Sequence, residues 1–351
     1  MAWIVQLPYG QGMLPASPPE ANLEAILLPR REEEAGDEAT LLREALAQPI
    51  GAPPLRELVR PHQQVAIVTS DLTRPCPSDR LLPLILEELA AAGVPASQVT
   101  VVLALGLHRP MTDGEIRATV GEAVVRRVRV INHDPQDTVW LGVTSAGTPV
   151  EILRPVVEAD VRICLGNLEL HYFAGYSGGA KAILPGCASR AAIRANHAMM
   201  VRREAAAGRL EGNPVRADIE EGAAMVGVDF ILNVVVNGHH RVVGAVAGDG
   251  RLAHRQGCDM VARRAKVQID RLADIVLVSA GGYPKDVNLY QAQKALDNAA
   301  YAVREGGILI LVAECREGLG NQIFESWMTT ASSPDELLDR IQQEFVLGGH
   351  K

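Results

Sequence analysis

Residues 161–186, VRICLGNLELHYFAGYSGGAKAILPG, carry the pattern that decides the fold class of this chain. The stretch opens with a run of aliphatic residues as far as Gly166 and then becomes polar and rich in glycine. A short apolar run that ends in a polar loop is typical of a strand buried in a parallel sheet. Residues 64–70 (QVAIVTS) and 99–105 (VTVVLAL) repeat the pattern. The pattern therefore predicts strands at all three places.

Strands that alternate with helical stretches predict an α/β fold. We expect two α/β domains with mostly parallel, helix-flanked sheets, Rossmann-like in layout, around a cleft. A new strand–helix–strand unit starts at residue 275, so the boundary is placed near residue 269. The N-terminal domain, residues 1–268, is expected to carry the cofactor and histidine motifs. The smaller C-terminal domain, residues 269–351, is expected to close the cleft.

Composition and charge exclude several classes of function. Of 351 residues 48% are hydrophobic, and the net charge of −8 argues against binding to a nucleic-acid backbone. The longest stretch without Asp, Glu, Lys or Arg, residues 89–108, is interrupted by glycine, proline and polar residues, so no membrane span is expected. No signal peptide is recognisable, and the five cysteines form no CxxC pair. We expect a cytoplasmic protein that binds neither nucleic acid nor membranes.

Four polar clusters follow predicted strands. They begin at Asp71, Gly106, Asn167 and Gly281. Because ligands of parallel α/β sheets bind beyond the carboxyl ends of the strands, we expect these clusters to form the rim of an active site.

The loop at residues 175–181 contains three glycines around Ser177 and ends in Lys181. Glycines allow backbone N–H groups to turn toward an anion such as a phosphate. The Walker A loop is the obvious competitor, but Ala180 stands where that motif has glycine and Ala182 where it has a hydroxyl. A P-loop nucleotidase is therefore disfavoured, and a purely structural glycine turn remains an alternative.

Three of the nine histidines lie in strand-end loops or in the helix after one, namely His108, His171 and His197. Imidazole titrates near neutral pH, so a pair of histidines can serve as base and acid, and a third can bind a metal. Arg74 offers a planar fork that suits a carboxylate. Lys294 shares a helical face with Gln291, although a solvated lysine is the simpler interpretation when it is taken alone.

With these residues assembled, the chain resembles the nickel-dependent lactate racemase family. The strongest passage is residues 171–186 followed by Asn196-His197. There a histidine, a GxSGG loop, a lysine, a Pro-Gly pair and an Asn-His pair follow one another at the spacing of the family. DLTRP at 71–75, GLHR at 106–109 and YQxxK at 290–294 resemble its other signatures.

The resemblance implies a nickel-pincer nucleotide, which is a pyridinium mononucleotide (pyridinium-3-thioamide-5-thiocarboxylic acid mononucleotide) with nickel bound by two sulfurs and a ring carbon. By match, Lys181 would tether this cofactor as a thioamide and His197 would supply the remaining nickel ligand. His108 and His171 would be the acid/base pair. Other matched residues would seat the cofactor, namely Asp71, Gly175, Ser177, Gly178, Gly179, Pro185 and Gly186. A last group would bind the substrate or order the site, namely Arg74, Tyr290, Gln291 and Lys294.

The implied activity is a racemase or epimerase that inverts the hydroxyl-bearing C2 carbon of a small 2-hydroxy acid. A histidine would take the hydroxyl proton while hydride moves to the cofactor, and hydride would return to the other face of a planar 2-oxo acid. Cofactor-building enzymes would be needed for maturation. The chain ends at Lys351, earlier than members of the family, so the identity of the 2-hydroxy acid stays open.

Two other functions remain alternatives. An NAD-dependent 2-hydroxyacid dehydrogenase would explain Arg74 and a catalytic histidine, but no GxGxxG opens a helix after a strand. A non-catalytic protein that captures a nucleotide or anion on the 175–181 loop would explain the glycines alone.

Overall fold

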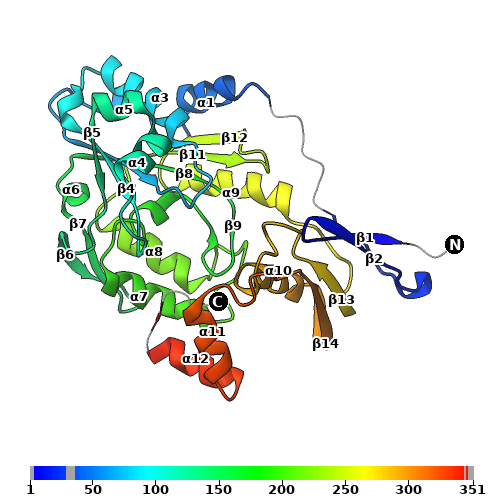
Figure 1. Cartoon of the computed structure of the whole chain (residues 1–351). Helices are drawn as coiled ribbons and strands as arrows, with labels where there is room; N and C mark the ends of the chain where they lie inside the picture. Colours follow the sequence, from blue (N-terminus) through cyan, green and yellow to red (C-terminus); the bar gives the residue numbers. More distant parts are fainter. Residues whose placement is uncertain (1–3, 29–35, 344, 347–351) are drawn as a thin grey trace. The chain divides into compact units, whose positions relative to one another are not determined.

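The computed structural model describes residues 4–28, 36–343 and 345–346. The chain divides into two compact units, a larger one at Arg30–Ala265 and a smaller one made of Met1–Pro29 and Lys266–Lys351. Both are mixtures of helices and strands, which confirms the predicted α/β class (Figure 1).

The larger unit is built on a six-stranded sheet with the strand order β12-β11-β8-β3-β4-β5. All neighbouring strands are parallel except the hairpin β11–β12. The strands are β3 (Val65–Ser70), β4 (Val99–Ala104), β5 (Arg129–Asn132), β8 (Val161–Asn167), β11 (Phe230–Val236) and β12 (Val242–Gly248). The three strands predicted from aliphatic runs are thus confirmed to within one residue at each end.

Side chains of this sheet alternate between two apolar clusters, one on each face. In β3, Ile67 belongs to the first cluster and Val68 to the second, and in β8 Ile163 and Cys164 divide in the same way. Burial on both faces is the reason that these strands are continuous aliphatic runs in the sequence.

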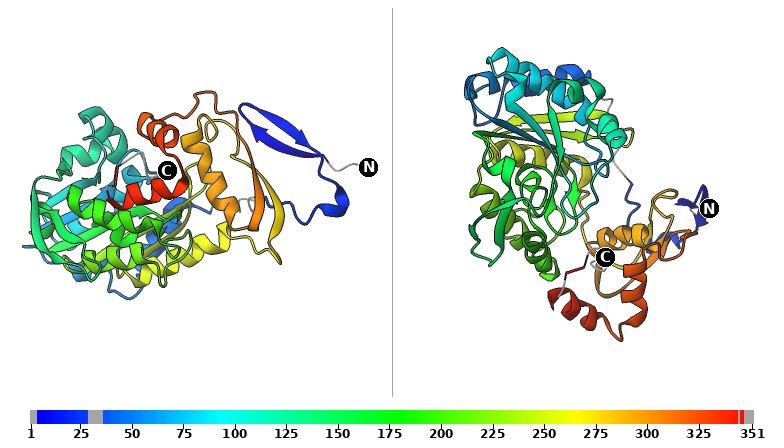
Figure 2. Two further views of the ribbon diagram at one scale, coloured as in Figure 1. Left: turned by 90° about the horizontal axis from the view of Figure 1, so that it is seen from below. Right: turned by 60° about the vertical axis from the view of Figure 1, so that its left-hand side comes forward.

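Helices cover both faces of the sheet, as the views in Figure 1 and Figure 2 show. The first face packs against α1 (Glu38–Ala47), α2 (Leu55–Leu58), α3 (Ser78–Ala91), α4 (Asp113–Val120) and α5 (Glu122–Arg127). The second face packs against α6 (Arg154–Val157), α7 (Arg190–Ala198), α8 (Pro214–Ala224) and α9 (Leu252–Ala265). Two small antiparallel pairs complete the unit, β6 (Thr138–Val143) with β7 (Pro149–Leu153) and β9 (Leu170–His171) with β10 (Gly175–Tyr176).

Capping residues set the helix starts on the second face. The Ser189 hydroxyl accepts a hydrogen bond from the backbone N–H of Ala192 at the start of α7. The Asn213 side chain accepts one from Arg216 at the start of α8, and Pro214 occupies the first helical position. Both are the residue types that such positions favour, because they satisfy N–H groups that have no partner within the helix.

Among its described residues, the smaller unit contains two two-stranded pairs and three α-helices. β1 (Val5–Tyr9) and β2 (Gly12–Ala16) are antiparallel, whereas β13 (Ala273–Ser279) and β14 (Val303–Val312) are parallel. The helices are α10 (Leu289–Ala300), α11 (Gln322–Thr330) and α12 (Pro334–Gln343). Across the described residues of both units, none of the helices is long and apolar enough to cross a membrane.

The division of the chain differs in one respect from the contiguous domains expected at 1–268 and 269–351. The change of unit falls at Ala265–Lys266, close to the expected boundary, but the first residues group with the C-terminal part. The reason is a hydrogen-bonded contact, because the Gly10 N–H donates to the buried Asp286 carboxylate at 2.7 Å and Tyr283 N–H donates to the Gly10 carbonyl at 2.7 Å. Hydrogen bonds between residues so far apart in the chain leave no local pattern in the sequence. The expected closure of a cleft by the C-terminal part stays a prediction.

Candidate active site

Three of the four polar clusters follow adjacent strands. β8, β3 and β4 are neighbours in the sheet and run parallel. The clusters that begin at Asn167, Asp71 and Gly106 therefore leave the sheet at the same edge. That this edge is the rim of an active site stays a prediction. The fourth cluster follows β13 and belongs to the smaller unit.

Asp71 and His108 form a close pair across two of these loops. Oδ2 of Asp71 lies 2.5 Å from Nδ1 of His108, and Asp71 is 4% exposed. Burial tends to raise the pKa of the Asp71 carboxyl, but hydrogen bonds from His108 and Thr73 outweigh burial and lower the pKa. An ionised Asp71 orients the Nδ1–H of His108 toward itself, which leaves Nε2 as the nitrogen with a lone pair.

Phe173 is the common neighbour of three of the expected site residues. Its ring centroid lies 4.6 Å from that of His171 and 4.9 Å from that of His197, both in edge-on geometry. The Lys181 Nζ lies 5.8 Å from the same ring centroid. Phe173 is only 3% exposed, so its ring is held by the surrounding protein. The amine of Lys181 and the two imidazoles lie around this ring.

The electrostatics of Lys181 favour an uncharged amine. Burial lowers the pKa of Lys181 well below its usual value, and the charges of Arg216 and then Arg74 lower it further against a partly opposing Glu169. A deprotonated amine carries the lone pair that a nucleophile needs.

His171 is held neutral by the same neighbourhood. Burial is the main cause that lowers its pKa well below the usual value, and the nearby charge of Arg74 lowers the pKa further. The backbone N–H of Ala174 donates to Nδ1 of His171 at 3.2 Å, so the neutral ring carries its proton on Nε2. His108 and His171 thus rest in opposite tautomers, the first with a lone pair and the second with a proton on Nε2.

His197 is oriented by a buried polar chain behind it. Its Nδ1 lies 3.0 Å from Oδ1 of Asn196, and the Asn196 amide donates to Asp218 at 2.7 Å. Asp218 also accepts hydrogen bonds from the hydroxyls of Thr144 and Thr148. An Asn196 oxygen that accepts from Nδ1–H places the lone pair of His197 on Nε2, which is the arrangement of a metal-binding histidine.

The glycine-rich loop is largely occupied by its own packing. Ser177 Oγ donates to the Asn167 carbonyl at 2.8 Å and accepts from the Glu169 N–H at 2.8 Å, while the Gly179 N–H donates to Asn233 at 2.8 Å. A Cβ at Gly178 would lie 2.7 Å from Asn233 Oδ1. These glycines are therefore required by close contacts within the protein. Their expected contacts with a cofactor stay a prediction.

Gly186, which follows Pro185, joins two loops of the site. The Gly186 carbonyl accepts a hydrogen bond from the Gly106 N–H at 3.0 Å. This bond connects the segment that follows Lys181 to the loop that contains His108. A Cβ at Gly186 would lie 2.9 Å from the Ala104 side chain, so only glycine fits. Contact of either residue with a cofactor stays a prediction.

Sequence reasoning missed the residues that support the site from behind. Arg216, Asn233 and His254 are all buried, and each donates or accepts a hydrogen bond at the loop between Asn167 and Lys181. Arg216 follows a helix cap, Asn233 lies within a strand and His254 within a helix, positions without local signs of function. Only the fold brings them to the loop.

Tyr290, Gln291 and Lys294 lie on α10 of the smaller unit. Lys294 Nζ donates to Gln291 Oε1 at 2.8 Å, and the rings of Tyr290 and Phe324 are 5.6 Å apart. Their role in substrate binding stays a prediction.

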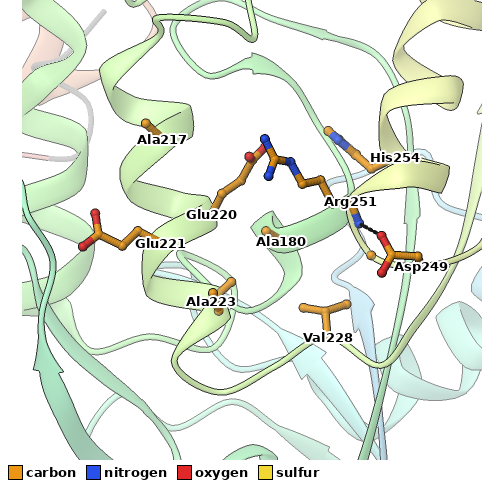
Figure 3. A pocket seen from close by; sticks show the side chains of 11 residues that line it. Ala180, Ala217, Glu220, Glu221, Ala223, Val228, Asp249, Arg251 and His254 are labelled. Carbon is orange, nitrogen blue, oxygen red and sulfur yellow. Dashed lines mark hydrogen bonds between the residues drawn. The ribbon is translucent and has the colours of Figure 1, made fainter. Parts of the chain in front are cut away.

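A pocket of about 490 Å³ lies beside the turn Gly179–Ala182, which contains Lys181. It is bounded by α8, α9 and the Asp249–Arg251 loop (Figure 3). Ala180 and His254 line it, whereas His108, His171, His197 and Lys181 do not. His254 Nε2 donates to the Ser177 carbonyl at 2.9 Å. This pocket is therefore separate from the gathering of histidines around Phe173.

Two family models match the chain. The lactate racemase N-terminal domain matches residues 9–208, and the lactate racemase C-terminal domain matches residues 269–345. The chain belongs to the lactate racemase family. It is an enzyme of the isomerase class, a racemase.

Individual relatives are similar along almost the whole chain. The lactate racemase of Thermoanaerobacterium thermosaccharolyticum is 36% identical over 348 residues, covering 96% of this chain and 80% of the relative. That of Lactiplantibacillus plantarum is 34% identical over 344 residues, with the same coverage. The solved structure of the lactate racemase apoprotein from T. thermosaccharolyticum matches with a TM-score of 0.89 at 34% identity, covering 99% of this chain and 84% of that one. A Thermotoga maritima protein shares the fold at 19% identity, with a TM-score of 0.63 over 91% of this chain and 83% of that one.

Proposed function

We propose that this enzyme is a 2-hydroxyacid racemase or epimerase that uses a nickel-pincer nucleotide tethered to Lys181. The observation that carries the proposal is the grouping of Lys181, His171 and His197 around Phe173. Membership of the lactate racemase family supports it. A nicotinamide-dependent dehydrogenase and a non-catalytic binding protein are both disfavoured by that membership.

The donor set at the site fits such a cofactor. Lys181 provides an amine whose lowered pKa favours the uncharged form needed for a covalent bond, and His197 provides one imidazole whose Nδ1 is engaged by Asn196. Among the described residues, no three His, Cys, Asp or Glu side chains gather into a metal site. In the proposal the cofactor therefore brings the other nickel ligands itself, and His197 completes the set.

When bound, the cofactor supplies a reversible acceptor for hydride from C2 of the substrate. Arg74 holds the substrate carboxylate through its planar fork. His108, with a lone pair on Nε2 and Asp71 behind it, takes the hydroxyl proton of one enantiomer. His171 serves the hydroxyl of the other enantiomer after its Nδ1 bond from Ala174 is released. A positioned acid or base of this kind contributes ~10²–10⁴-fold to the rate.

Residues of the smaller unit complete the proposal. Gln291 and Lys294, with Tyr290 beside them, are proposed to add polar contacts to the substrate when the C-terminal unit closes over the site. We further propose a cytoplasmic location, and maturation by the enzymes that build the cofactor. A small 2-hydroxy acid is the proposed substrate class.

The decisive experiment is mass analysis of the Lys181 peptide from protein produced together with the cofactor-building enzymes. An adduct on Lys181 and interconversion of enantiomers in a chiral panel of 2-hydroxy acids are expected. Lys181→Arg is the matched control, because it keeps a long, nitrogen-containing side chain but offers no reactive amine. An unmodified Lys181 in matured, nickel-containing and active protein would contradict the tether. Oxidation of NADH by a 2-oxo acid in place of racemisation would contradict the reaction class.

A further inference from the structure

Asp218 is a carboxylate in the interior of the larger unit. It lies on α8 with 1% of its surface exposed. Three groups donate hydrogen bonds to it, namely the Asn196 amide and the hydroxyls of Thr144 and Thr148. All three donors are neutral, so none of them offsets the cost of burying an anion. A carboxylate at this position therefore calls for an explanation.

The hydrogen bonds of Asp218 all run toward its oxygens. Oγ1 of Thr144 accepts the backbone N–H of Thr148 at 3.1 Å, so the hydrogen of this hydroxyl is directed to Oδ1 of Asp218. Oδ2 accepts from the Thr148 hydroxyl at 2.9 Å and from Nδ2 of Asn196 at 2.7 Å. Asp218 thus acts only as an acceptor, as an ionised carboxylate does.

The Asn196 amide is thereby held in one orientation. Of the two hydrogens on Nδ2, one is directed to Asp218 at 2.7 Å and the other to the Val215 carbonyl at 3.2 Å. Both partners can only accept, so the amide cannot turn over without placing its oxygen against a carboxylate oxygen. Its Oδ1 therefore faces Nδ1 of His197 at 3.0 Å and requires a hydrogen there.

The turn between β6 and β7 is attached to α8 independently of Asp218. Glu221, three residues further along the helix, accepts the backbone N–H of Ser145 at 2.7 Å and its hydroxyl at 2.6 Å. A neutral amide at position 218 would also offer partners to the two threonines of this turn, because an amide both donates and accepts. Attachment of the turn therefore does not account for a buried negative charge. The Asn196 amide does, since it needs a partner that cannot donate.

We infer that Asp218 is a positioning residue for the proposed nickel ligand: through the Asn196 amide, its carboxylate holds the hydrogen of His197 on Nδ1 and leaves Nε2 for the metal. The metal-binding purpose rests on the proposed function. A histidine binds a metal through the nitrogen that carries no hydrogen, and the partner of the other nitrogen decides which one that is. The carboxylate also polarises the amide, which makes its oxygen a stronger acceptor.

An asparagine at position 218 would remove this constraint. Its amide can present either the oxygen or the NH₂ group to Asn196. In the second case the Asn196 amide turns over and directs Nδ2 at His197, whose Nδ1 then becomes an acceptor. Asp218→Asn should therefore give a mixture of the two His197 tautomers, whereas the original protein should have one.

The test is the tautomer of His197 in the full-length apoprotein, read by NMR from the shifts of its two ring nitrogens after labelling with ¹⁵N-histidine. Spectra are recorded at a pH above the range in which imidazole titrates, and the spectrum of His197→Ala identifies the signals. We expect the hydrogen on Nδ1 in the original protein and a substantial Nε2–H population in Asp218→Asn. In matured protein, nickel retained after dialysis should fall by ~10-fold in Asp218→Asn.

Thr148→Val is the matched control. It removes a hydroxyl that donates to the same Asp218 oxygen at 2.9 Å, and it leaves the carboxylate and the Asn196 amide in place. Urea unfolding should show a loss of stability in both variants, but only Asp218→Asn should change the His197 tautomer. If Asp218 served only to hold the β6–β7 turn, both variants would lose stability and both would keep the original tautomer.

An unchanged His197 spectrum in folded Asp218→Asn, or a hydrogen on Nε2 in the original protein, overturns the inference. Circular dichroism checks the fold of each variant. If Asp218→Asn does not fold, Asp218→Ser takes its place with the same two outcomes, because a hydroxyl also both donates and accepts. The tautomer is measured without cofactor or nickel. The absence of an adduct on Lys181 in matured protein would therefore refute the proposed function and leave this result unaltered.

Discussion

The Nδ1 atom of His108 lies 2.5 Å from Oδ2 of the buried Asp71, and this contact determines which nitrogen of His108 is basic. The carboxylate holds the proton on Nδ1, and Nε2 keeps its lone pair. His171 has the reverse arrangement, because its Nδ1 accepts a backbone N–H. The two histidines of the proposed acid/base pair are therefore prepared for opposite proton transfers before substrate binds.

Asp71→Asn should lower the turnover of matured enzyme by ~10²–10⁴-fold, since an amide no longer favours the Nδ1–H tautomer of His108. Chiral analysis of 2-hydroxy acid interconversion, divided by the cofactor loading that mass analysis gives for each variant, measures the loss. Thr73→Val is the control, because it removes only the hydroxyl that donates to the other Asp71 oxygen at 2.6 Å. Equal turnover in Asp71→Asn and the original enzyme would refute the assigned role.

Lys181→Met should stabilise the apoprotein at neutral pH. The folded-state pKa of Lys181 lies below the ordinary value of 10.5, so between these two values the unfolded chain binds a proton that the folded chain does not. Folding therefore carries a cost that methionine removes. Urea unfolding measures the gain, which should disappear above pH 10.5. The control Lys285→Met, at an exposed position, should change stability by less than about 0.5 kcal/mol. A less stable Lys181→Met variant at neutral pH would contradict the uncharged amine.

His254 should make the fold sensitive to acid. Burial lowers its pKa to about 3, and burial also lowers the pKa of His133 to about 4. Below pH 6.5 these two histidines become protonated in the unfolded chain but stay neutral in the folded chain. The free energy of unfolding should therefore fall by ~1.4 kcal/mol per pH unit for each histidine. Urea unfolding at a series of pH values tests this. His254→Gln should reduce the slope, and a change at the exposed His239 should leave it unaltered. Equal slopes in both variants would show that His254 is not the cause.

The sequence predicts those features of the structure that depend on local patterns, and it does not predict those that depend on contacts between residues far apart in the chain. β3, β4 and β8 were predictable because a strand buried on both faces is an uninterrupted aliphatic run, and the parallel sheet then brings their polar ends to one edge. The meeting of Lys181 with His197 at Phe173 followed only through the family resemblance. Arg216 was not predictable, because an arginine in a short helix is ordinarily solvated and nothing local indicates burial.

The glycines of the lysine loop show the same limit. Their spacing suggested a cradle for a phosphate, whereas close contacts with Asn233 and His254 account for Gly178 and Gly179. The sequence identifies positions where only glycine fits but does not distinguish an approaching ligand from an approaching side chain.

Asn196→Leu should weaken nickel retention by ~10–100-fold, because residues that orient a metal-binding histidine contribute on this scale. The substitution removes the oxygen that lies 3.0 Å from Nδ1 of His197 and keeps a side chain of similar size. Nickel measured after dialysis of matured protein gives the result, and His197→Ala should lose more. The Lys181 adduct should persist in both variants, because the covalent bond does not involve the imidazole. Full nickel content in His197→Ala would remove that residue from the metal site.

Gly179→Ala tests whether glycine is needed at this position for packing within the protein or only for contact with a phosphate. Gly179 has a φ of +58°, and an added Cβ would lie 2.7 Å from the His254 ring, so the apoprotein should lose ~1–3 kcal/mol of stability. Gly114 on α4 is the matched control, since a Cβ there meets nothing within 4 Å and alanine should add ~0.5–1 kcal/mol. Urea unfolding of the two apoproteins measures the difference. If glycine at 179 served only to admit a ligand, Gly179→Ala would leave apoprotein stability unchanged and impair cofactor loading alone. If it serves packing, stability must fall before any cofactor is present, and loading must fall with it because the turn carrying Lys181 is displaced.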